Sequence, residues 1–211
     1  MNSWEERFPR LWAFGEKVSV LVIGSLLFYI FSAPLISIPV ALVGLFAAIA
    51  ALIRPVPGES VVRFWRGCRR TFGRALLLGL IDLAVGLVLW LDFRFFWSLG
   101  TPLTRVAACL FGSLGVVLAM ANVYAWPLLT WYPQPLGKLL KRSFMLAAAH
   151  PFQALLGLAG AAVAPLLFLV LPGPVKALAV LLGPALSTYA LSAAAWHAMK
   201  RYAGAEDEFA E

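Results

Sequence analysis

The sequence predicts an all-α protein, a polytopic bundle of six transmembrane helices with amphipathic helices on its cytoplasmic surface. Of its 211 residues, 62% are hydrophobic and 13% are charged, whereas soluble domains are usually about half apolar and a quarter charged. From Val18 to Ile53 no side chain is charged, and four further apolar stretches follow. Residues 18–199 are therefore predicted to form a single membrane domain.

The uncharged run is predicted to form a hairpin of two spans, 18–33 and 37–53. One helix of its 36 residues would be ~54 Å long, nearly twice the ~30 Å hydrocarbon core of a bilayer. Pro34 and Pro39 stand near its middle. A proline interrupts a helix because it lacks the N–H and clashes with the preceding turn. The turn is therefore expected within residues 32–39.

Residues 1–17 are expected to form a cytoplasmic leader. Its large apolar residues recur at helical spacing, which is typical of a short amphipathic helix on the membrane surface. A frayed polar leader is the alternative. A secretory signal peptide begins with a positive region, whereas this leader carries Glu5, Glu6 and Glu16.

Four further spans are predicted at 75–91, 106–131, 151–171 and 177–199, each long enough to cross a bilayer with some tilt. Six spans place both chain ends on one side, and residues 200–211 form an acidic tail there. Fourteen of the 17 Lys and Arg residues fall on that side and three on the other. Because basic loops stay in the cytoplasm, both ends are predicted to be cytoplasmic.

Two amphipathic surface helices are predicted on the cytoplasmic side, at 59–74 and 136–147. In the first, Val61, Trp65, Cys68 and Phe72 share an apolar face opposite four arginines. In the second, Leu136, Leu139, Leu140, Ser143 and Ala147 lie opposite Lys138, Lys141, Arg142 and Met145. The two segments match at an offset of 72 residues, and each is followed by Leu-Leu-Gly-Leu. A parallel internal repeat would explain this match, and so would convergence of two basic amphipathic loops.

The basic side chains of these two segments are candidates for binding anionic lipid or a cytoplasmic partner protein. The net charge of +7 could also suggest nucleic acid. The basic residues lie between apolar spans, however, so membrane orientation and anionic lipid explain them better. The candidates are Arg63, Arg66, Arg70, Arg74, Lys138, Lys141 and Arg142.

Asp82 is the most informative polar residue inside the predicted spans. It lies about seven residues, hence ~10 Å, inside the third span. An aspartate near the centre of a span costs roughly 2.5–3.5 kcal/mol on insertion scales, so it should face other helices or a wet cavity. Asn122 lies at a similar depth, and Thr188 is a further candidate. The group would form an ion or proton site, or a hydrogen-bonded clamp between helices.

Asp92 and Arg94 are expected to form a structural pair at the outer end of the third span, with each other or with a neighbouring loop. No catalytic motif, cofactor-binding motif or metal-ligand spacing is found, so no enzyme activity, cofactor or metal is expected. Cys68 and Cys109 fall on opposite sides of the predicted membrane, which excludes a disulfide within one chain.

Three stretches resemble the YesL-like family of bacterial membrane proteins. They are Phe64-Trp-Arg-Gly-Cys-Arg-Arg-Thr-Phe72 leading to Leu-Leu-Gly-Leu, Leu91-Asp-Phe-Arg-Phe-Phe96, and Lys138-Leu-Leu-Lys-Arg-Ser-Phe144 running into Ala149-His-Pro151. The resemblance implies a bacterial plasma membrane location. It also implies an association with carbohydrate uptake, because YesL-like proteins are typically found beside sugar-binding transporter systems.

Three functions are therefore expected as alternatives. The first is a non-enzymatic accessory factor in carbohydrate uptake that contacts a sugar transporter subunit. The second is a small carrier or channel with Asp82 and Asn122 along its path. The third is a lipid-binding organiser that uses the arginine-rich helix.

Overall fold

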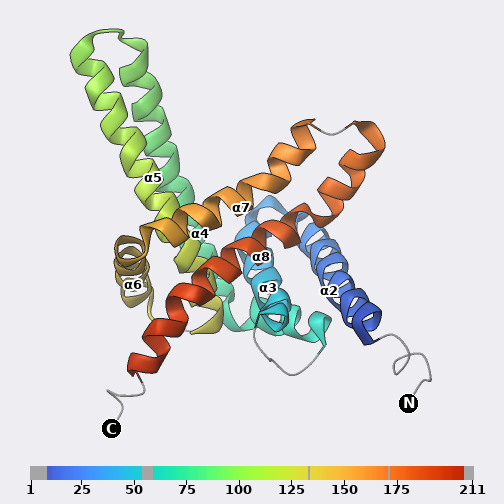
Figure 1. Ribbon diagram of the computed structural model, residues 1–211. Helices are drawn as coiled ribbons and strands as arrows, with labels where there is room; N and C mark the ends of the chain where they lie inside the picture. The colour runs from blue at the N-terminus through green and yellow to red at the C-terminus, as the bar shows by residue number, and fades with distance from the viewer. Residues whose placement is uncertain (1–8, 54–58, 133, 171, 207–211) are drawn as a thin grey trace.

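The computed structural model describes residues 9–53, 59–132, 134–170 and 172–206, and this part of the chain is helical without a β-strand (Figure 1). Residues 1–8 of the predicted leader and 207–211 of the predicted tail lie outside the described residues. The helices, in chain order, are α2 (Pro9–Ser32), η1 (Leu35–Ser37), α3 (Ile38–Ile49), η2 (Ala50–Leu52), α4 (Ser60–Ser98), α5 (Pro102–Trp131), α6 (Leu136–Ala149), α7 (Pro151–Val170) and α8 (Gly173–Glu206).

The chain is all-α, and five of its described helical stretches are long and apolar enough to cross a bilayer. These stretches are Leu35–Leu52, Ser60–Ser98, Pro102–Trp131, Pro151–Val170 and Ala179–Lys200. A shorter apolar stretch, Lys17–Ser32, lies in α2. By length and composition the chain is therefore a helical, multi-pass membrane protein.

The first turn lies where the prolines predict it, between the end of α2 at Ser32 and the start of α3 at Ile38. The Ser37 hydroxyl donates to the carbonyl of Phe31 and, over 2.7 Å, to that of Pro34. Pro39 stands in the first turn of α3, where its missing N–H costs no hydrogen bond. Local backbone chemistry thus accounts for the turn.

Two predicted boundaries do not coincide with helix ends, because the helices run through them. α2 begins at Pro9, so the described part of the leader is continuous with the first span. α4 joins the predicted surface helix 59–74 to the predicted span 75–91 and continues to Ser98. No proline stands between Pro57 and Pro102, and a change from polar to apolar side chains does not by itself break a helix.

The next turn is tight and explains why α5 begins at Pro102, four residues before the predicted span. Gly100 adopts a φ of 72°, a left-handed conformation that glycine reaches without steric cost. The Thr101 side chain then accepts a hydrogen bond from the Thr104 backbone N–H over 3.3 Å. Pro102 follows at the start of the helix, the position that proline favours.

α3 forms the centre of the bundle, because most of its residues are buried and it packs against α2, α4, α5 and α8. Glycine allows α4 to come close to it: a Cβ added at Gly67 would lie 2.7 Å from the Cβ of Ala47, and one at Gly44 would lie 2.9 Å from the Phe64 ring. Small residues play this part in membrane proteins because they allow helix backbones to approach closely.

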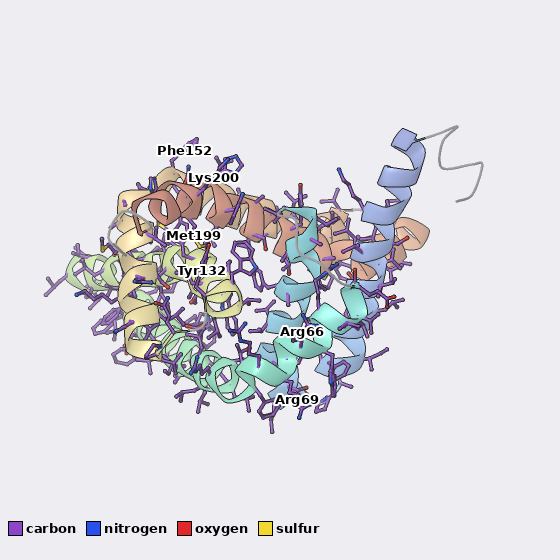
Figure 2. The ribbon with its side chains drawn as sticks, turned by 90° about the horizontal axis from the view of Figure 1, so that it is seen from below. Arg66, Arg69, Tyr132, Phe152, Met199 and Lys200 are labelled. Carbon is purple, nitrogen blue, oxygen red and sulfur yellow. The ribbon has the colours of Figure 1, made fainter. Side chains whose placement is uncertain are left out.

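Two helical hairpins, α4–α5 and α7–α8, diverge from this centre (Figure 1). Their turns point away from the side on which both chain ends and α6 lie. Figure 2 views the molecule from that side and shows Arg66 and Arg69 of α4, Tyr132 at the end of α5 and Lys200 near the end of α8. We call this side the basal face.

Candidate sites between the helices and on the basal face

Asp82 lies in α4 at the point where the α4–α5 hairpin leaves the centre of the bundle. Ala75 and Leu78, just before it, are completely buried, whereas Leu83, just after it, is 67% exposed. Beyond this point the two helices contact mainly each other, and the rings of Phe96 and Phe111 stack at 5.4 Å. The carboxyl group therefore stands between the packed centre and a projecting arm.

The Asp82 carboxylate faces two hydrogen-bond donors on α5. These donors are the Asn122 amide and the Trp126 indole N–H. Both are neutral, so the group carries a negative charge whenever Asp82 is ionised. The structure thus brings Asp82 and Asn122 together, as expected from their equal depth. Trp126 is not among the candidates that the sequence gives. Its four-residue spacing from Asn122, which places both on one helix face, is the signal that could have found it.

Thr188 is buried, but it belongs to α8 and not to the α4–α5 pair that holds Asp82. Its neighbour Ser187 donates a hydrogen bond over 2.9 Å to the carbonyl of Ala161 in α7. Ser187 therefore fastens the second hairpin, and Thr188 is not among the hydrogen-bond partners of Asp82, which are Asn122 and Trp126.

The first half of α4 has a different buried face from the one expected. Arg66, Arg70 and Arg74 are exposed, as predicted, and so is Arg69 between them. Arg63 is 8% exposed and donates to the Ser60 hydroxyl over 3.0 Å. The prediction that it shares the outer basic face is therefore wrong.

The expected apolar face of this segment is also wrong. Trp65 is 56% and Phe72 54% exposed, whereas Phe64 is 1% exposed. Of the four residues of the predicted apolar face, Cys68 is buried. Its Sγ–H donates to the Val40 carbonyl over 3.4 Å. The reason is the close approach at Gly44, which brings α3 onto the Phe64 side of α4. Val61, like Trp65, is exposed.

α6 has the two faces that its sequence predicts. Leu139, Ser143 and Ala147 are buried, and the helix packs against α5. Four exposed residues form the other face: Lys138, Lys141, Arg142 and Met145. The placement of this helix at a membrane surface stays a prediction.

Asp92 and Arg94 do not pair with each other within the described chain. The Arg94 guanidinium instead lies over the Trp90 ring, 5.5 Å from its centroid. The reason is that residues two apart on a helix point to different sides, whereas residues four apart share a face. α4 continues through both residues.

Cys68 is buried, Cys109 is exposed, and both are free thiols. In the described ranges, no three His, Cys, Asp or Glu side chains come together in a way that could hold a metal ion. No family model, no curated protein and no solved structure matches this chain.

Proposed function

We propose that this chain is a non-enzymatic accessory protein of carbohydrate uptake that crosses the bacterial plasma membrane six times. Both chain ends and the basal face lie in the cytoplasm in this proposal. Successive helices reverse direction between the basal face and the hairpin turns (Figure 1), which supports an even number of crossings. The role in sugar uptake rests on the resemblance to the YesL-like family.

The observation that carries the proposal is the exposed basic residues of α4 and α6. Arg66, Arg69 and Arg70 on α4, and Lys138 and Lys141 on α6, are exposed. The opposite sides of the same helices are packed against α3 and α5. The cations thus face outward on rigidly held helices, an arrangement suited to docking an anionic surface of a transporter subunit.

The test is site-specific photocrosslinking in native membranes with the full-length protein. Probes replace Arg69 and Lys141 on the basal face, and matched probes replace Arg105 and Lys176, the basic residues of α5 and α8 near the hairpin turns. The proposal expects one sugar transporter subunit to be captured from the basal positions and not from the control positions. Capture of lipid alone at both basal positions would overturn the accessory role.

A small-solute carrier is the second candidate, favoured by the group formed by Asp82, Asn122 and Trp126. An acid with neutral donors inside the apolar region is able to take up and release a proton or a cation as solute moves. Proteoliposomes that contain the purified protein should then show solute flux that Asp82→Asn changes and Asp92→Asn does not. Absence of flux for a broad panel of sugars and ions would exclude this candidate.

A further inference from the structure

The first half of α4 and the whole of α6 have the same role in the fold. Each follows a span, α3 or α5, packs against that span, and leads into the next one. At the offset of 72 residues, the exposed Arg66, Arg69 and Arg70 correspond to Lys138, Lys141 and Arg142, which are also exposed. The two segments therefore share the order of their cations along the helix and the exposure of each one.

The buried positions agree as well. Thr71 is 2% exposed and donates its hydroxyl to the Gly67 carbonyl over 2.9 Å, one turn earlier. Ser143, its counterpart, is completely buried and donates to the Leu139 carbonyl over 2.8 Å, also one turn earlier. The bond to the carbonyl one turn earlier is common for Ser and Thr in helices and also occurs at Ser19 and Thr130. The agreement that supports a duplication is therefore the burial of a hydroxyl at the same position of both segments.

The residues that follow continue the correspondence. Phe72 and Phe144 are both exposed, and Ala75 and Ala147 are both buried. The Leu-Leu-Gly-Leu sequences correspond only after six further residues in the second unit, because Gly79 and Gly157 are 78 residues apart. In each, the glycine lies against the preceding span: an added Cβ would collide with the ring of Pro39 at Gly79 and would lie 2.9 Å from Val123 Cγ1 at Gly157.

The two units differ at several equivalent positions and at their joins. Buried Arg63 corresponds to exposed Pro135, and buried Phe64 corresponds to the half-buried Leu136. Exposed Arg74 corresponds to Leu146, which is 7% exposed. α4 runs on without a break, whereas α6 ends at Ala149 and α7 begins at Pro151. Pro151 explains the break, because a proline disfavours helical backbone in the preceding residue.

The depth of the cations follows from the continuity of α4. Its apolar part begins at Ala75, directly after Arg74. Arg66 is eight residues before Arg74, hence ~12 Å further along the helix. The headgroup region on one side of a bilayer is roughly 5–8 Å thick, half the difference between a ~30 Å core and a ~40–45 Å bilayer. Long arginine side chains reach along the helix toward phosphates. The exposed Trp65 and Phe72 beside these arginines suit the same layer.

We propose that the first half of α4 and the whole of α6 are equivalent segments of an internal duplication, and that each binds the headgroup of an anionic phospholipid through its three exposed cations. The ligand is a phospholipid of the cytoplasmic leaflet, because exposed aromatic side chains accompany the cations on both helices. The proposal rests on the membrane placement proposed above. It competes for the same cations with the docking of a transporter subunit, and the test below separates the two.

The full-length protein is placed in nanodiscs that contain both phosphatidylcholine and phosphatidylglycerol. The lipid molecules that each variant retains are then counted by native mass spectrometry. The α4 variant is R66Q/R69Q/R70Q, the α6 variant is K138Q/K141Q/R142Q, and the control is R105Q/K176Q. Each of the first two should lose about half of the bound phosphatidylglycerol, their combination nearly all of it, and the control none. Lysine variants of the α4 arginines keep the charge, so R66K/R69K/R70K should retain most of the lipid if the fold is intact.

Four results would overturn the proposal. One triple variant could remove all the phosphatidylglycerol, which contradicts two equivalent sites. Neither could change it, or phosphatidylcholine could be retained equally well, which contradicts headgroup recognition. The last is capture of an acidic protein in place of lipid at both faces in native membranes. That result would leave the accessory role standing while refuting the lipid sites, so the two proposals fail separately.

Discussion

The crossing of α3 and α4 gives the sharpest prediction about stability, which concerns Gly44→Ala. The added Cβ would lie 2.5 Å from the Cys68 Sγ and 2.9 Å from two atoms of the Phe64 ring. Both neighbours are buried, so neither side chain has space into which to turn. Overpacking of this kind costs about 1–3 kcal/mol. Gly44→Ala should therefore lower the free energy of unfolding by that amount, although alanine is the better helix former.

The measurement is reversible unfolding of the purified protein in mixed micelles, followed by tryptophan fluorescence. Gly73→Ala is the matched control, because it lies in the α4 helix with nothing within 4 Å of an added Cβ, and it should stabilise the protein by up to about 1 kcal/mol. The double variant with Cys68→Ala should recover part of the loss, since it removes the nearer of the two contacts. If Gly44→Ala were as stable as Gly73→Ala, the close approach of α3 and α4 would be refuted.

Three further stability predictions use the same unfolding measurement. Asp82→Asn should preserve or raise stability because it removes a charge from the apolar region, whereas Asn122→Ala should lower it by removing a donor to the carboxylate. Equal losses in both would contradict this. Gly160→Leu should cost about 1–3 kcal/mol, because even a Cβ there would lie 2.7 Å from α8; an unchanged midpoint would refute the α7–α8 contact. Arg63→Met should cost about 1–3 kcal/mol, because it removes the hydrogen bond from the buried Arg63 guanidinium to the Ser60 hydroxyl. Arg70→Met, at an exposed site, should change the stability by less than about 0.5 kcal/mol.

Features of the fold that depend on neighbouring residues could be predicted from the sequence. The turn at Pro34 follows from the proline ring itself, and the faces of α6 follow from a regular separation of leucines from basic residues. The continuity of α4 could not be read in this way. The charge pattern changes at Arg74, but helix continuity depends on backbone sterics, and these do not change there.

The faces of α4 could not be predicted because they depend on the partner helix. A wheel places the largest apolar residues inward, whereas α3 approaches where Gly44 leaves room, and so Phe64 is buried and Trp65 is exposed. The contacts of Asp82 could be predicted only in part, because they also depend on a partner helix. The depth of Asp82 and Asn122 can be counted along each helix, but the contribution of Trp126 depends on how α5 is rotated against α4.

The different joins of the two equivalent units give a last prediction. Arg70 and Asp82 lie on one unbroken helix, 12 residues and hence ~18 Å apart, so a movement of the α4 basic face is transmitted to the carboxylate. α6 is separated from α7 by the non-helical His150, whose carbonyl accepts a hydrogen bond from the Tyr124 hydroxyl over 3.0 Å. That join is fastened to α5, and a movement of α6 stops there.

Anionic lipid should therefore shift the infrared carboxyl band of Asp82, identified by difference from Asp82→Asn, in the wild-type protein and in K138Q/K141Q/R142Q. The shift should be lost in R66Q/R69Q/R70Q, because that variant lacks the cations of the continuous helix. An equal loss in both variants would mean that the bilayer as a whole, and not α4, carries the effect. Retention of the shift in the α4 variant would show that the basic face and Asp82 are independent, in spite of the helix that joins them.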